Sequence, residues 1–223
     1  MKKIYNNSIG LFVLYFICSS LFFTTTSFAS NVADAEKILQ SSVTQIMNDI
    51  QSEKYRNSST RPSVVAKIKT QVYSIFDFEE FTMRTVGMHW KKLNINQKKD
   101  FTDAFAALLF ATYLSRIDDY NKNAKGNTET IAYAGMTSGN NGTRVEVRTV
   151  LTLNNNQKLP MNYRMLPKKG AWRVYDVIIE NVSLVKNYRT QFYDALQNDS
   201  PEKLIQLIRA KTQEIEGGNK NAN

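Results

Sequence analysis

The chain has 223 residues and a formal net charge of +9, with one histidine and one cysteine. A disulfide framework and a metal site built from several thiolates are therefore excluded. The basic excess suits nucleic acid, an anionic lipid surface or an acidic protein partner. Charge alone does not separate the last two partners, and it is equally typical of a surface that only keeps the protein in solution.

The first 29 residues have the pattern of an export signal. Lys2 and Lys3 precede an apolar run at positions 9–23, which is shorter than a comfortable membrane span. Small residues at Ser27 and Ala29 predict cleavage after Ala29, and an uncleaved membrane anchor is the alternative. Export argues against nucleic acid as the partner.

Four helices are predicted next, because apolar residues recur every three to four positions. They run from Val32 to about Glu53, from Thr60 to Ile75, from Asp77 to Trp90, and from Asn94 through Tyr113. A polar break at Tyr55–Thr60 separates the first two. The third and fourth helices are apolar beyond one stripe, so each must be covered on most sides by protein or by a ligand.

The period of the apolar residues then changes to two, which predicts strands. Four strands are expected at Thr130–Met136, Thr143–Leu153, Leu159–Leu166 and Trp172–Ile179. Short turns between them favour an antiparallel meander. Two helices follow, one at about Val182–Leu196 and one that begins at Ser200–Pro201. The order predicts an α+β fold, a curved four-stranded antiparallel sheet with packed helices, as one domain at residues 30–216 with a disordered tail at 217–223.

The residue types that carry catalysis are sparse. There is no nucleophile elbow and no glycine-rich phosphate loop, and His89 lies at a predicted helix end, where capping or packing is the commoner role. Asp176 and Glu180 share a strand face but lie about 13 Å apart, too far to share a proton. Pairing with Arg173 or capping of the next helix is a simpler role. We therefore expect no enzyme activity, no cofactor and no metal site.

Aromatic side chains crowd the two apolar helices and the sheet. A filled aromatic core accounts for any one of them, whereas the excess as a group is also typical of a cavity wall. From the residues alone both interpretations stay open.

Three segments carry a family resemblance. Phe76–Trp90 is an aromatic helix, Gln97–Tyr113 a long apolar helix, and Val174–Phe192 a strand that leads into a helix. Together they resemble the MlaC family, also called the toluene-tolerance family, over about residues 33–214. Asn181 stands where that family usually has glycine, and asparagine also tolerates a left-handed backbone.

The resemblance implies a function as well as a fold. It implies an NTF2-like sheet whose helices enclose an apolar lipid cavity, in a periplasmic carrier that shuttles phospholipid between the outer and inner membranes and maintains lipid asymmetry. It also implies two partners, an outer-membrane lipoprotein–porin complex and an inner-membrane ABC transporter complex. An exported NTF2-like enzyme, with His89 or a buried carboxylate as base, and a binding module without ligand remain the alternatives.

A carrier of this kind needs a large apolar site. Burying an acyl chain of about 15 methylenes is worth roughly 12 kcal/mol, and two tails need a cavity on the order of 1,000 Å³. The predicted lining residues are Phe78, Phe81, Val86, Phe105, Leu108, Leu109, Tyr113, Tyr133, Val147, Leu153, Tyr163, Trp172, Val174, Val177, Val182, Val185 and Tyr188. The predicted docking residues are Lys168, Lys169, Arg173 and Arg189.

Overall fold

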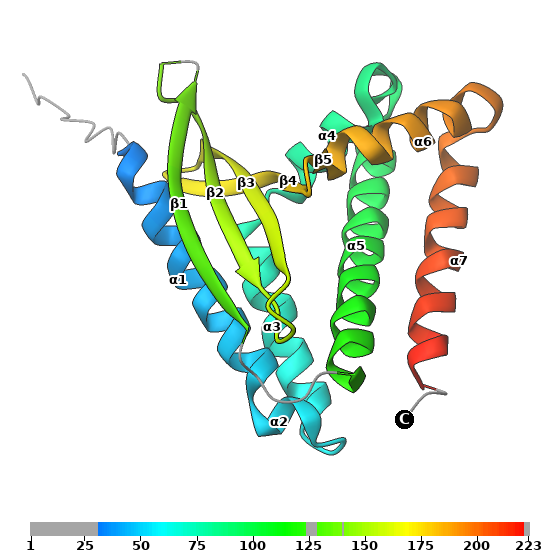
Figure 1. Cartoon of the computed structure of the whole chain (residues 1–223). Helices are drawn as coiled ribbons and strands as arrows, with labels where there is room; N and C mark the ends of the chain where they lie inside the picture. Colours follow the sequence, from blue (N-terminus) through cyan, green and yellow to red (C-terminus); the bar gives the residue numbers. More distant parts are fainter. Residues whose placement is uncertain (1–30, 124–128, 140, 221–223) are drawn as a thin grey trace, which may run out of the picture.

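The computed structural model describes residues 31–123, 129–139 and 141–220, so the predicted export signal lies outside it. The first part is helical, with α1 (Val32–Gln51), α2 (Glu53–Arg56), α3 (Arg61–Ile75), α4 (Phe78–Val86), the 3-10 helix η1 (Gly87–Lys92) and α5 (Ile95–Asn123). The strands are β1 (Thr130–Gly139), β2 (Arg144–Thr152), β3 (Lys158–Lys168), β4 (Ala171–Ile179) and β5 (Val182–Ser183). Helices α6 (Leu184–Asn198) and α7 (Pro201–Lys220) complete the described chain. The predicted α+β class is confirmed (Figure 1).

The sheet is an antiparallel meander in the order β1-β2-β3-β4-β5. The four predicted strands are present, but the sheet has a fifth strand, β5, that was not predicted. The predicted start of the following helix is also wrong. Glu180 and Asn181 have positive φ values of 48° and 67°, so the chain turns back after β4. Val182 then pairs with Ile179 as part of β5, and the helix predicted from Val182 begins at Leu184 instead. The left-handed backbone expected at Asn181 is confirmed.

A β-bulge in β4 decides which of its side chains face inward. Arg164 pairs with Asp176 whereas Met165 pairs with Val174, so Tyr175 is an extra residue on β4. The bulge compensates for the odd spacing between Val174 and Val177, and both are buried in one apolar cluster.

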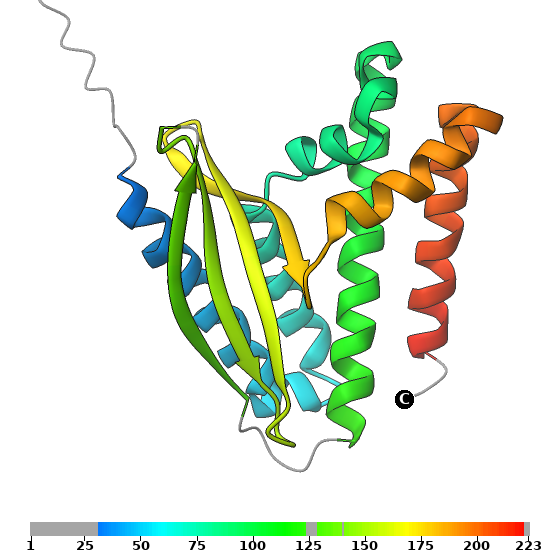
Figure 2. The ribbon, with the colours of Figure 1, turned by 45° about the horizontal axis from the view of Figure 1, so that its top comes forward.

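The helices form two groups around the sheet. α1 and α3 pack on one face of the sheet, which we call the inner face, through residues such as Leu39, Ile75 and Val147. α4, α5, α6 and α7 form the second group, in which α5 and α7 lie side by side (Figures 1 and 2). β1, β2 and β3 lie in front of α1 and α3 in both views, and none of the described helices covers their outer face.

The helices predicted from Asp77 and from Asn94 begin at capping side chains. The Asp77 side chain accepts a hydrogen bond from the backbone N of Glu80 at 3.0 Å. Asn94 and Gln97 cap each other's backbone N at 2.9 and 2.8 Å, a reciprocal pair that starts α5. The helix predicted to run from Asp77 to Trp90 is shorter, since Gly87 has a φ of +63° that ends α4 at Val86.

Two polar segments differ from expectation. The predicted break at Tyr55–Thr60 overlaps the end of α2, and Tyr55 is buried there in an apolar cluster with Val64 and Ile68. Its hydroxyl donates to Asp118 on α5 at 2.7 Å. Arg61 also pairs with Asp118. At the other end, α7 continues to Lys220, so the predicted disordered tail is wrong for residues 217–220, and residues 221–223 lie outside the description.

Candidate functional site

The interior is divided between two large apolar clusters. The first, the helical cluster, joins α4, η1, α5, α6 and α7 around buried residues that include Phe81, Phe105 and Phe192. The second, the sheet cluster, joins α1 and α3 to the inner face of the sheet. Phe76 and Leu184 are half-buried and pack against both clusters. The junction between the clusters is therefore apolar and incompletely covered.

Aromatic rings form the helical side of this junction. The ring of Phe105 lies 4.9 Å from that of Tyr188 and 4.8 Å from that of Phe192, measured between centroids. Tyr188 and Tyr113 are only half-buried. Burial raises the pKa of Tyr113 to about 12, so its hydroxyl stays neutral at ordinary pH. This wall is aromatic, and one cation lies beside it, since the Arg116 guanidinium is 5.6 Å from the centroid of the Tyr113 ring.

The sheet side carries two more tyrosines. Tyr163 is buried on β3, and burial raises its pKa above the usual tyrosine range. Burial also raises the pKa of Tyr133 to about 12, with a smaller contribution from Glu36. The Tyr133 hydroxyl is buried without a hydrogen-bond partner among the described residues. The two hydroxyls on the sheet side are therefore neutral, although the Glu36 carboxylate lies near Tyr133.

Most of the predicted lining lies inside one of the two clusters. The fully buried members are Phe81, Val86, Phe105, Leu108, Leu109, Val147, Tyr163, Trp172, Val174, Val177 and Val185. The half-buried members are Phe78, Tyr113, Tyr133 and Tyr188. Leu153 is also half-buried, but it belongs to neither cluster. Val182 does not belong to a cluster, because its place on β5 leaves it 55% exposed. Leu184, two residues further, was missed, since sequence alone does not place it at the junction.

Open space in the described part of the chain lies elsewhere. One surface pocket of about 510 Å³ is lined by Met88, His89, Leu93 and Leu196, among others, and another of about 490 Å³ lies on α3 beside Tyr73. Neither is lined by a predicted cavity residue. Most of the predicted lining residues pack within the helical cluster or the sheet cluster instead.

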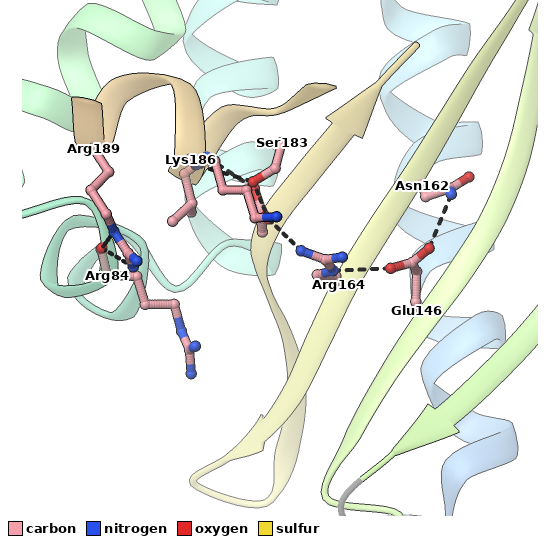
Figure 3. A network of polar contacts seen from close by, with 9 residues as sticks. Arg84, Glu146, Asn162, Arg164, Ser183, Lys186 and Arg189 are labelled. Carbon is pink, nitrogen blue, oxygen red and sulfur yellow. Dashed lines mark hydrogen bonds and ion pairs between the residues drawn. The ribbon is translucent and has the colours of Figure 1, made fainter. Parts of the chain in front are cut away.

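A polar network fixes the start of α6 beside the junction (Figure 3). Asp176 is buried and accepts from the Ser183 hydroxyl at 2.7 Å and from the backbone N of Val185 at 3.1 Å. The predicted capping role of Asp176 is therefore confirmed. Its cationic partner is Arg164, at 3.2 Å, and not Arg173, because the register places Arg164 opposite it.

Two of the four predicted docking cations are used within the fold. Lys168 lies 2.7 Å from Asp77 and 3.1 Å from Glu79 on α4. Arg189 donates from its Nε to the Arg84 carbonyl at 2.8 Å (Figure 3). Lys169 is exposed in the β3–β4 turn, and Arg173 is half-buried on β4. Lys168 and Arg189 therefore hold α4 against the sheet and α6.

The remaining titratable groups include the histidine considered above as a base. The ring of His89 packs 5.8 Å from that of Tyr193, as expected for a structural histidine. Within residues 31–123, 129–139 and 141–220, no cluster of three or more His, Cys, Asp or Glu side chains is placed to hold a metal ion. No helix in these ranges is both long and apolar enough to cross a bilayer.

Known proteins share this sequence pattern and fold. The toluene tolerance protein ttg2D of Pseudomonas putida is 23% identical over 163 residues, 73% of each chain. A solved structure of a phospholipid-binding protein from Ralstonia solanacearum, in complex with a phospholipid, is 22% identical with a TM-score of 0.68. That match covers 82% of this chain and 98% of the other, and at this identity it shows a shared fold. The family model described as MlaC protein matches residues 40–210, so the resemblance drawn from the sequence is confirmed and the chain belongs to the MlaC family.

Proposed function

We propose that this protein is a periplasmic phospholipid carrier that holds acyl tails between the helical cluster and the sheet cluster. The observation that carries the proposal is the apolar junction at Phe76 and Leu184, which both clusters share and neither fully covers. When acyl tails enter there, each cluster loses apolar contacts with the other cluster and gains apolar contacts with the tails. The clusters therefore separate at small cost in hydrophobic free energy. The phospholipid complex of the Ralstonia solanacearum protein, which has the same fold, supports this cargo.

The carrier hands lipid to membrane partners and does no chemistry on it. Release of a tail into water would forfeit roughly 12 kcal/mol of burial for about 15 methylenes, so transfer requires a docked partner. Family membership favours an outer-membrane lipoprotein–porin complex and an inner-membrane ABC transporter complex in this role, and with them the maintenance of lipid asymmetry. The neutral tyrosines Tyr113 and Tyr133 suit tail contacts better than head-group recognition.

The test is lipid extraction from protein that was expressed with its own export signal and purified without detergent from a Gram-negative periplasm. Mass spectrometry of the extract should find intact diacyl phospholipid, and intact mass should place the mature N-terminus at Ser30. Accumulation of lysophospholipid and fatty acid over time would instead identify a lipid hydrolase. A protein that yields no lipid would be the binding module without ligand.

A matched pair of variants locates the site. Leu184→Glu places a charge at the junction and introduces an acidic residue into the first turn of α6, where a negative charge is favourable to the helix. Val182→Glu makes the same change two residues away, at a side chain that is 55% exposed. We expect Leu184→Glu to lose bound lipid while Val182→Glu keeps it, with both variants folded by circular dichroism. Equal lipid content in the two variants would place the tails elsewhere.

A further inference from the structure

The outer face of the sheet carries an unusual set of charges. Arg144, Glu146 and Arg148 alternate on β2 with the buried Val145 and Val147, so their side chains share the face that is turned away from α1 and α3. On β4, Arg173 lies between the fully buried Trp172 and Val174 and therefore points to the same outer face. Arg164 on β3 completes the set through its pairing with Glu146.

The two acidic side chains of this face are both held by one arginine. Arg164 contacts Glu146 through Nε at 2.9 Å and Asp176 through Nη1 at 3.2 Å (Figure 3). Among the described residues, Arg144, Arg148 and Arg173 make no ion pair with a carboxylate. As far as the structure describes it, the outer face thus presents three guanidinium groups that are not ion-paired.

The chemistry of the face favours a protein over a membrane. Surfaces that bind a bilayer combine basic side chains with exposed apolar ones that insert. Among the described residues, the exposed large apolar side chains come from η1, from the helices and, in the case of Val182, from β5, and none comes from β1–β4. Guanidinium groups match carboxylates in a planar, two-point geometry.

We propose that the outer face of the sheet, through Arg144, Arg148 and Arg173, docks an acidic protein surface that presents aspartate and glutamate side chains. The proposal goes beyond the carrier function, since it holds whatever the protein carries. The sequence predicted docking through Lys168 and Arg189, among others, but both side chains make contacts within the fold. The proposal therefore places the docking surface on arginines that make no ion pair with a carboxylate among the described residues.

The experiment measures binding of fluorescently labelled poly-L-glutamate to the full mature protein at low and high salt. The test variant reverses the three arginines together, as Arg144→Glu, Arg148→Glu and Arg173→Glu. The control makes the same change in net charge away from the sheet, as Lys37→Glu, Lys91→Glu and Lys92→Glu, at exposed side chains. Thermal unfolding and lipid content are recorded for both, so that loss of fold or of cargo is distinguished from loss of docking.

We expect the test variant to bind poly-L-glutamate at least about tenfold more weakly than the natural protein, and the control to change about twofold or less. Equal loss in the two variants would overturn the proposal, because binding would then follow net charge alone. Tight binding to phosphatidylglycerol vesicles, lost only in the test variant and stronger than the binding of poly-L-glutamate, would also overturn it and assign the face to a membrane. Should the test variant unfold, the single changes Arg144→Gln and Arg148→Gln, both at exposed positions, decide the same question.

Discussion

Replacing Asp176 by alanine tests whether the start of α6 depends on one buried carboxylate. The carboxylate is 2% exposed and accepts from Ser183, Val185 N and Arg164. Its removal leaves the first two donors without an acceptor. Removing one partner of a buried ion pair costs about 3–5 kcal/mol, and we expect the lower end. The reason is that Arg164 keeps its contact with Glu146 and its side chain is 35% exposed, so water can solvate it.

Glu146→Ala is the matched control, because it removes the other carboxylate from the same arginine. The Glu146 side chain is 26% exposed, and Arg164 would keep Asp176, so the expected cost is about 1 kcal/mol or less. Urea unfolding followed by circular dichroism measures both costs, provided that the slope of the transition is unchanged. Hydrogen exchange of the first-turn amides of α6, compared with those of α7, shows where the stability is lost.

The reasoning would be refuted if Asp176→Ala and Glu146→Ala lowered the free energy of unfolding equally. It would also fail if the α6 amides exchanged no faster in Asp176→Ala than in the natural protein. Either result would mean that apolar packing of α6, and not the polar network, fixes its start.

Two further predictions concern the backbone and the tyrosines. Gly87→Ala should lower the free energy of unfolding by about 1–2 kcal/mol, because φ is +63° there although nothing lies within 4 Å of the added methyl group. Gly139→Ala, where the space is equally open and φ lies outside the left-handed region, should change stability by about 0.5 kcal/mol or less in the same thermal unfolding assay. The pKa of Tyr113 is about 12 in the folded protein and near 10 in the unfolded chain, so the folded state is stabilised while the hydroxyl is neutral in both states. This contribution is fully present below about pH 10 and is lost as the pH rises toward about 12. Urea unfolding at pH values from about 8 to 11 should therefore show a loss of stability that is smaller in Tyr113→Phe, and an unchanged loss in this variant would contradict the assignment.

Local signals made much of the fold predictable. The caps at Asp77 and at Asn94–Gln97 involve residues three positions apart, so the sequence contains both partners of each hydrogen bond. The left-handed turn at Asn181 is local in the same sense. Short-range chemistry of this kind does not depend on how the rest of the chain packs.

Long-range contacts were not predictable from the pattern. Tyr55 lies in a polar segment, and its burial depends on contacts with distant parts of the chain: its ring packs in an apolar cluster with Val64 and Ile68, and its hydroxyl bonds to Asp118, 63 positions away. The same holds for the choice of Arg164 over Arg173 as the partner of Asp176, which the cross-strand register decides. A bulge at Tyr175 changes that register, and the odd spacing between Val174 and Val177 is compatible with the bulge but does not show which residue pairs with Arg164.

The candidate site was predictable as a set of apolar residues but not as a place. A cavity wall and a packed core use the same side chains, so the pattern selects Phe105 and Val147 without saying which surface they face. Val182 is exposed whereas Leu184, two residues further, packs against both clusters, because the two-residue strand β5 lies between β4 and α6. Which apolar residues a ligand meets is therefore set by strand pairing and helix position, and less by hydrophobicity.

The start of α6 joins the apolar and polar parts of the molecule. Leu184 packs on both clusters, and its neighbours Ser183 and Val185 are bonded to Asp176. One turn further, Arg189 binds the carbonyl of Arg84 at the end of α4. If the clusters move apart to admit a lipid, Leu184 must leave one of them, while Asp176 holds the same turn to the sheet. The sheet contact is therefore the one that we expect to persist, with the helical cluster moving away from the strands about the first turn of α6.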